Sequence, residues 1–213
     1  MIRKETRLNP KLGPYYKELQ RLTDQYVRLL QEARIPTPKV VRSEADEARL
    51  LFVCEYKGLN ILEFLEKGGL EALLSRSELL NQILEIIRKA QRRALNFDPH
   101  IKNFVVDHKA VYYVDFTPPW LQEYYDLRLS VATKVEQEIL LPFYRCMEPE
   151  NLGFHFCSDF LKMDRSNISF MPELHQILRK REMISGDYGA FLGRCEQIMN
   201  DELRRERQGV YLL

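Results

Sequence analysis

The most informative segment of the chain is Asp98-Pro-His-Ile-Lys-Asn103-Phe-Val-Val106, followed after a short turn by Val111-Tyr-Tyr-Val-Asp115-Phe116. Two apolar runs on either side of a polar turn predict a β-hairpin. An acid and an amide precede the first strand, and a second acid closes the second strand. Because the connecting segments are short, we expect Asp98, Asn103 and Asp115 to face one cavity.

The order acid, amide, acid resembles the order in which kinase-like enzymes place the groups that hold metal-bound phosphates and activate a hydroxyl. An Asp at the end of a strand is well placed to reach Mg²⁺, a hard cation that takes oxygen ligands and keeps several waters. Asn103 would supply a second, neutral oxygen, so Asn103 and Asp115 are the predicted metal ligands. Asp98 would accept the proton of an attacking hydroxyl, which requires hydrogen-bond reach more than a shifted pKa. Asp98, Asn103 and Asp115 are therefore the candidate catalytic residues.

In this stretch the chain resembles the protein-kinase-like superfamily, and within it the aminoglycoside/choline phosphotransferase branch. That branch typically reads H-G-D-x-H-x-x-N, followed by a strand that ends I-D-F or I-D-W. Asp98, His100, Asn103 and Asp115 match this pattern position by position, while Asn96 stands in place of the first His. In this pattern we expect His100 to orient the loop through a hydrogen bond.

The resemblance implies an α+β, two-lobed fold. Residues 1–56 would form a reduced N-terminal lobe with a short antiparallel sheet and one long helix, and residues 57–213 a larger, mainly helical lobe that carries the catalytic-type loop. It also implies ATP and Mg²⁺ as cofactors and transfer of a phosphoryl group to a hydroxyl of a small-molecule acceptor. Thr117 stands where a protein kinase has the Gly of D-F-G, which the small-molecule branch tolerates.

In the resembled family a strand leads into a hinge, a Gly and a helix, and adenine bonds to backbone groups of that hinge. Glu55 and Tyr56 follow the apolar run Leu50-Leu-Phe-Val-Cys54 and precede Gly58. The resemblance therefore makes Glu55 and Tyr56 the candidate adenine contacts. Judged by its residues alone, the same segment is also an ordinary strand-to-helix connection.

The resemblance runs from about Arg3 onward and includes no Gly-rich phosphate-covering loop, because no G-x-G-x-x-G occurs in the sequence. It assigns Lys4 as the phosphate-binding Lys and Glu18, on the long helix, as its ionic partner. Without the resemblance, Lys4 is equally well explained as a charge near the chain terminus, and Glu18 as an ordinary exposed residue of the helix. Two functions stay open: an ATP-dependent phosphotransferase, and a non-catalytic pseudokinase module completed by a protein partner.

The spacing of apolar residues predicts the other elements. Ser75-Arg-Ser-Glu78 has the pattern of a capping box, in which a Ser side chain caps the helix that follows. The predicted strands cover residues 1–8, 39–42 and 49–55, with a charged turn at 43–47. The predicted helices run from Pro14 to near Arg34 and over residues 75–95, 127–145, 155–162, 172–181 and 188–207.

Composition narrows the class of protein. The 32 basic residues nearly balance the 31 acidic ones, so no basic field indicates binding to nucleic acid. No apolar run approaches the length that spans a bilayer and no signal-peptide pattern opens the chain, so we expect a soluble, cytoplasmic protein. The four cysteines are widely spaced, which predicts reduced, buried thiols.

Five aromatic residues lie close to Asp115 in the sequence. They would either line a substrate pocket and stack on a sugar, base or cation, or pack in the core, which is the commoner outcome. The five are Tyr112, Tyr113, Trp120, Tyr124 and Tyr125.

Overall fold

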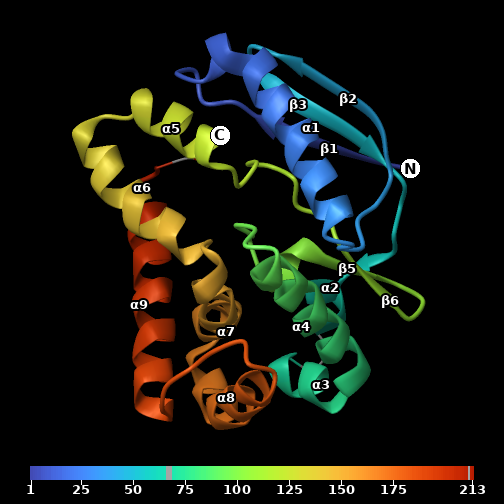
Figure 1. Ribbon diagram of the computed structural model, residues 1–213, viewed down its shortest axis with the longest axis vertical. Helices are drawn as coiled ribbons and strands as arrows, with labels where there is room; N and C mark the ends of the chain where they lie inside the picture. Colours follow the sequence, from blue (N-terminus) through green and yellow to red (C-terminus); the bar gives the residue numbers. More distant parts are fainter. Residues whose placement is uncertain (66–68, 211) are drawn as a thin grey trace.

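The N-terminal part of the chain forms a three-stranded antiparallel sheet covered by one long helix. The computed structural model describes residues 1–65, 69–210 and 212–213. In it, β1 (Ile2–Arg7) and β2 (Val40–Asp46) pair on either side of β3 (Arg49–Cys54). The helix α1 (Tyr16–Glu32) lies across this sheet and contacts β2 and β3, as Figure 1 shows. The predicted order of strand, helix, strand and strand is therefore confirmed.

The strand β3 is central because its side chains are apolar along most of its length. Leu50, Leu51 and Phe52 are all buried, as the apolar run predicts. Burying each such side chain contributes about 1.5–3 kcal/mol, which holds α1 on the sheet. The buried apolar residues of α1 are Leu19, Leu22, Tyr26, Val27 and Leu30.

The turn between β2 and β3 lies later than predicted. Residues 43–46, which were expected in the turn, continue to pair with β3, so that Ser43 faces Phe52. Asp46 closes the turn, because its Oδ1 accepts hydrogen bonds from the backbone N–H groups of Ala48 at 2.9 Å and Arg49 at 3.0 Å. Charged residues therefore extend this edge strand, where their side chains reach solvent.

A second antiparallel sheet contains the predicted hairpin. β5 (Phe104–Asp107) and β6 (Ala110–Tyr113) pair with each other, and the short β4 (Leu59–Asn60) pairs with β5. Gly58 enters β4 with φ of 88°, and a Cβ at this position would lie 1.8 Å from the backbone oxygen of Val106. This close approach of two backbones requires glycine.

The rest of the described chain is helical, and the whole fold is α+β, as expected. None of the described helices is long and apolar enough to cross a membrane. The α-helices are α2 (Ile61–Leu65), α3 (Gly69–Ser75), α4 (Ser77–Arg92), α5 (Gln122–Ser130), α6 (Lys134–Cys146), α7 (Leu152–Met163), α8 (Met171–Lys180) and α9 (Tyr188–Arg207). The 3-10 helices are Gly13–Tyr15, Ile101–Asn103, Pro149–Asn151 and Arg165–Phe170.

Two predicted helix features are wrong. The predicted helix 127–145 is two helices, because Thr133 starts α6: its hydroxyl accepts from the Glu136 N–H at 3.2 Å, and its own N–H donates to the Glu136 carboxylate at 2.7 Å. The capping box at Ser75 does not form, because Ser75 ends α3 and its hydroxyl donates to the backbone oxygen of Ala72 at 2.9 Å.

The helices α7 and α9 pack side by side along much of their length (Figure 1). Cys157 of α7 and Cys195 of α9 contact each other in this interface. All four cysteines are buried and free, as predicted. This helix pair matters for function, because polar side chains of both helices reach the loop described next.

Candidate active site

The residues that open the sequence pattern lie on a loop, residues 96–103, which we call the Asp98 loop. It follows α4 and is anchored at both ends. The backbone N–H of Phe97 donates to the backbone oxygen of Met147 at 3.0 Å. The backbone N–H of Ile101 donates to the carboxylate of Asp159, on α7, at 2.8 Å. These contacts fix the loop against the C-terminal helices.

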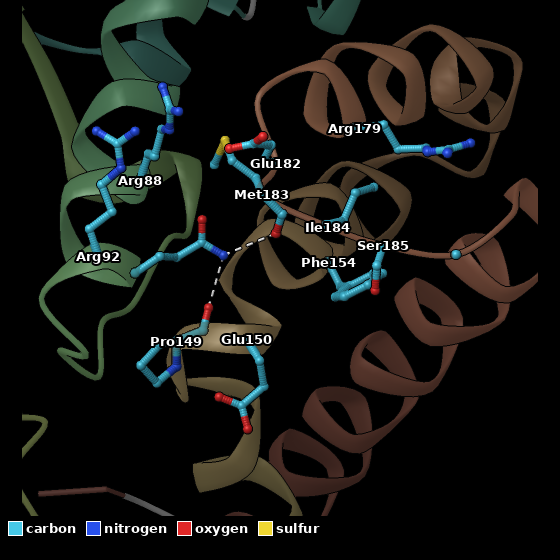
Figure 2. A pocket seen from close by; sticks show the side chains of 12 residues that line it. Arg88, Arg92, Pro149, Glu150, Phe154, Arg179, Glu182, Met183, Ile184 and Ser185 are labelled. Atoms are coloured by element: carbon cyan, nitrogen blue, oxygen red, sulfur yellow. Dashed lines mark hydrogen bonds between the residues drawn. The ribbon is translucent and has the colours of Figure 1, made fainter.

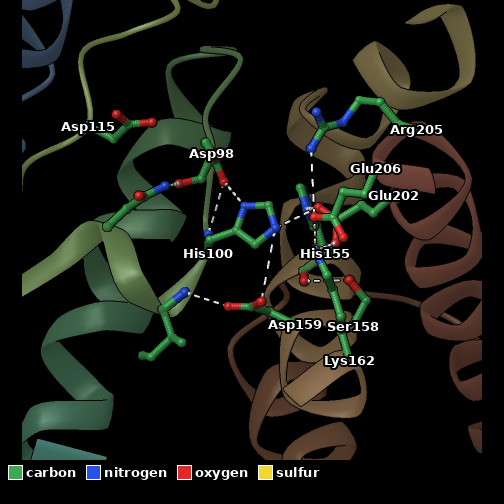
Figure 3. A network of polar contacts seen from close by, with 12 residues as sticks. Asp98, His100, Asp115, His155, Ser158, Asp159, Lys162, Glu202, Arg205 and Glu206 are labelled. Carbon is green, nitrogen blue, oxygen red and sulfur yellow. Dashed lines mark hydrogen bonds and ion pairs between the residues drawn. The ribbon is translucent and has the colours of Figure 1, made fainter. Parts of the chain in front are cut away.

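The structure brings Asp98, Asn103 and Asp115 into one region. The side-chain amide of Asn103 donates to the backbone oxygen of Asp98 at 3.3 Å. The backbone oxygen of Asn103 accepts from the N–H of Val114 at 2.9 Å, which places the end of the hairpin, and with it Asp115, beside the loop. All three side chains are buried, and Figure 3 shows Asp98 and Asp115 on the same side of the network.

Lys4 is paired with Asp115 and not with Glu18. Its ammonium group, on β1, donates to the Asp115 carboxylate. Glu18 has 45% of its side chain exposed and binds Arg21, one turn further along α1, at 2.7 and 2.9 Å. The predicted Lys4–Glu18 pair is therefore wrong, because a neighbour at i+3 satisfies Glu18 locally and buried Asp115 supplies the anion for Lys4.

A cavity of about 350 Å³ lies between the N-terminal sheet and the Asp98 loop. The predicted adenine contacts Glu55 and Tyr56 both border it. The N–H of Glu55 already donates to the backbone oxygen of Lys39 at 3.0 Å. By contrast, neither backbone polar group of Tyr56 has a hydrogen-bond partner among the described residues. The lining residues that matter here are Lys4, Cys54, Glu55, Tyr56, Asn103 and Phe116.

A larger cavity, of about 820 Å³, lies between α4 and the turn after α8. Figure 2 shows Arg88 and Arg92 of α4 on one side of it and Met183 on the other. Gln91 also lines this cavity, and its side-chain amide donates a hydrogen bond to the backbone oxygen of Met183 at 3.1 Å. Its described lining includes none of the predicted site residues, so we place the candidate site at the smaller cavity.

Asp98 is held by an imidazole, as the predicted orienting role of His100 requires. The backbone N–H and the Nδ1–H of His100 both donate to Asp98 Oδ1. On the other side of the ring, Nε2 lies 2.5 Å from Glu202 Oε1. The Nε2 of His155 lies 2.8 Å from the same oxygen (Figure 3). One buried network therefore connects Asp98 to α7 and α9.

His155, Asp159 and Glu202 were not among the site residues predicted from the sequence. One local signal could have found Glu202: it continues the buried stripe of α9. An acid at such a core position needs a buried partner. Neither the partner nor the link to the Asp98 loop has a local signature. The apolar members of the stripe are Phe191, Cys195, Ile198 and Met199.

The charges of this network stabilise one another. Burial raises the pKa of Asp98, but the His100 imidazolium lowers it further, so that the net pKa lies below its ordinary value. Burial lowers the pKa of His100, but Asp98, Glu202 and Asp159 raise it well above its ordinary value. Asp98 is therefore an ionised carboxylate at neutral pH, paired with a protonated imidazole.

The pKa of Asp115 is shifted in the opposite direction, above its ordinary value. Its burial raises its pKa, and the Lys4 ammonium offsets this only in part. A buried carboxylate that is poorly compensated gains most from an additional cation. Asp115 and the side-chain oxygen of Asn103 thus fit the oxygen donors that Mg²⁺ prefers.

Most of the five aromatic residues that lie near Asp115 in the sequence are buried in the hydrophobic core. Tyr113, Trp120 and Tyr124 are at most 1% exposed. Tyr125 stacks on Tyr144 with ring centroids 4.3 Å apart and planes 8° apart. Tyr113 packs against Phe97, and Trp120 against Phe143 of α6, so stacking on a substrate is not supported for these residues.

No family model, no curated protein and no solved structure matches this chain. Function therefore has to be inferred from the geometry and chemistry of the site.

Proposed function

We propose that this protein is a two-lobed, kinase-like phosphotransferase that uses ATP and Mg²⁺ to phosphorylate a hydroxyl of a small molecule. The observation that carries the proposal is the position of Lys4. It borders the same cavity as Glu55 and Tyr56 and is in ionic contact with Asp115, next to the Asp98 loop. The cavity for the adenine base, the phosphate-binding Lys4 and the metal-binding Asp115 would thus lie next to one another.

The cavity suits a nucleotide base. Its volume of about 350 Å³ falls in the range of small-molecule sites, roughly 300–1,000 Å³. Phe116 and Cys54 provide apolar walls. The backbone N–H and C=O of Tyr56, which have no hydrogen-bond partner among the described residues, would supply the donor and acceptor that an adenine edge needs for orientation.

The polar end of the site suits phosphates and a divalent cation. Asp115 and Asn103 would hold Mg²⁺, which when bound neutralises phosphate charge. Lys4 would leave Asp115 for phosphate oxygens, because these carry more negative charge than one carboxylate. Asp98, ionised and held in place by His100, would accept a hydrogen bond from the acceptor hydroxyl and take its proton during transfer.

The second candidate is a non-catalytic, nucleotide-binding module that acts through a protein partner. The Lys4–Asp115 ion pair favours it, since the pair satisfies the carboxylate that would otherwise hold the metal. Absence of a G-x-G-x-x-G loop points the same way, because that loop covers the phosphates in kinases.

Calorimetric titration with a non-hydrolysable ATP analogue and Mg²⁺ tests the proposal. Wild type should bind, Lys4→Met should bind at least about tenfold more weakly, which is 1.4 kcal/mol, and Glu18→Gln should match wild type. Absence of binding by wild type, or equal binding by Lys4→Met, would refute both candidates.

A second assay separates the two candidates. Wild type is incubated with ATP, Mg²⁺ and a panel of small hydroxylated acceptors, and phosphorylated products are measured by mass spectrometry. Product formation supports the phosphotransferase. Nucleotide binding without any product, across the panel, supports the non-catalytic module.

A further inference from the structure

Two histidines and a glutamate converge in the interior, away from the cavity that we assign to the nucleotide. His100 comes from the Asp98 loop, His155 from α7 and Glu202 from α9. Both Nε2 atoms approach Glu202 Oε1, at 2.5 and 2.8 Å, and the two rings meet edge to face with centroids 4.6 Å apart. The three side chains are between 0% and 5% exposed. We call them the His–Glu cluster.

Polar atoms in this cluster lack the hydrogen bonds that buried groups normally make. Among the described residues, His100 Nε2, Glu202 Oε2 and His155 Nδ1 have no hydrogen-bond partner, although the first two lie within ion-pair distance of a charged group. Native proteins leave few buried polar atoms in this state, and an ion missing from the coordinates is one of the physical reasons.

The contact between His100 and Asp98 has the form that orients a metal-binding histidine. A histidine that binds a metal through one ring nitrogen usually donates the other N–H to a carboxylate. His100 donates its Nδ1–H to Asp98, so in the neutral ring the lone pair is on Nε2. The Nε2 atom lies on the side of the ring that faces α7 and α9, 2.5 Å from Glu202 Oε1 (Figure 3).

The charges of the cluster call for a divalent cation. Asp98, Asp159 and Glu202 bring three carboxylates, and the ammonium group of Lys162, 3.5 Å from Glu202 Oε2, is shared with Glu206 at 2.5 Å. A divalent ion bound beside these carboxylates would offset part of their negative charge.

We propose that the His–Glu cluster binds one transition-metal ion of the zinc class through His100, His155 and Glu202. Two imidazole nitrogens and one carboxylate suit Zn²⁺ and its first-row neighbours, whereas Mg²⁺ and Ca²⁺ prefer oxygen alone. Zinc bonds of about 2.0–2.2 Å place tetrahedral ligand atoms roughly 3.3 Å apart. The Glu202 oxygen, 2.5 and 2.8 Å from the two nitrogens, would therefore move away from them to leave room for the ion.

The ion would tie the Asp98 loop to α7 and α9 at one point. It is separate from the Mg²⁺ site at Asn103 and Asp115, because its donors are mainly nitrogen. The proposal does not depend on phosphotransfer, and it holds whether the chain is an enzyme or a binding module.

The experiment uses the full chain expressed in medium supplemented with ZnCl₂ or CoCl₂, since a buried site is best loaded during folding. After dialysis against EDTA, metal content is measured by mass spectrometry, and the cobalt form by visible absorption. Wild type should retain about one ion per chain. His155→Gln and Glu202→Gln should lower metal content at least about tenfold.

The matched control is His175→Gln. This histidine is also buried, but it lies on α8 and contacts the backbone oxygen of Gly186 at 3.3 Å, outside the cluster. The control should retain the ion at the wild-type level. Equal loss in His175→Gln would show that the variants act through general destabilisation.

Three results would overturn the proposal. One is wild type without zinc or cobalt after dialysis, and another is unchanged metal content in both cluster variants. The last is a sulfur-to-cobalt charge-transfer band in wild type, which would place the ion at Cys157 and Cys195. Because the wild-type spectrum reports the ligand type directly, it decides the question even where a variant does not fold.

Discussion

The ammonium group of Lys4 and the carboxylate of Asp115 form an ion pair between residues 111 positions apart in the sequence. Lys4 lies on β1 and Asp115 follows β6, so the pair ties the first sheet to the hairpin beside the Asp98 loop. Asp115 is the more deeply buried partner, with 12% of its side chain exposed against 35% for Lys4. Loss of Lys4 would thus leave a buried carboxylate without its cation, which costs more than loss of a surface pair.

Lys4→Met should lower the free energy of unfolding by about 1–3 kcal/mol, below the full cost of breaking a buried pair because Lys4 is partly exposed. Adding Asp115→Asn should recover part of this loss, since the amide carries no charge. Urea unfolding of both single variants and the double variant measures the coupling. Arg3→Met, at an exposed neighbour, serves as the control. Strictly additive losses would mean that the pair does not stabilise the fold.

The ion pair of Glu136 with Lys11 predicts a pH dependence of stability. The side-chain contact with Lys11, with help from the Thr133 cap, lowers the pKa of Glu136 from 4.5 to about 2. Because the folded-state pKa lies below the unfolded one, the stabilisation is complete above pH 4.5 and is lost as pH falls toward 2.

Glu136→Gln should therefore destabilise the protein by about 1 kcal/mol near pH 6, a value discounted because 44% of the Lys11 side chain is exposed. The difference from wild type should shrink between pH 4.5 and 3.5. Chemical unfolding at several pH values checks this. A difference that grows on acidification would contradict the assigned sign.

Gly58→Ala should be among the most damaging single substitutions in the chain. Its φ of 88° and the oxygen of Val106 at 1.8 Å from an added Cβ leave no space for a side chain. We expect a loss of more than about 2 kcal/mol, through strain and a broken β4–β5 contact. The control is Gly193→Ala in α9, where nothing lies within 4 Å, and which should stabilise by about 0.5–1 kcal/mol. Thermal unfolding of both variants compares them.

Asp98→Asn should keep nucleotide binding but lower turnover by at least about 10²-fold, because the amide cannot accept the hydroxyl proton. Circular dichroism verifies the fold, and steady-state kinetics with any acceptor found in the panel measures the effect. Asp126→Asn, on the exposed side of α5, is the matched control. Turnover that survives in Asp98→Asn would remove Asp98 from the proposed mechanism.

Much of the fold could be predicted because it depends on local patterns. The hairpin of β5 and β6 follows from two apolar runs around a polar turn, and α1 follows from apolar residues at helical spacing. Both patterns reflect backbone geometry, which repeats every two residues in a strand and every 3.6 in a helix. The full length of β2 could not be predicted, because it depends on pairing with β3. The break before α6 could not be predicted either, because it depends on the cap that Thr133 forms.

That Asp98, Asn103 and Asp115 lie together could be inferred from their spacing, because a short loop and a hairpin leave them little freedom. Only the tertiary structure decided the partners of the charged groups. Lys4 meets Asp115 rather than Glu18, and Glu202 reaches His100 across the interior. The physical reason is that apolar packing sets which distant elements touch, and a charge then pairs with whatever opposite charge is buried beside it.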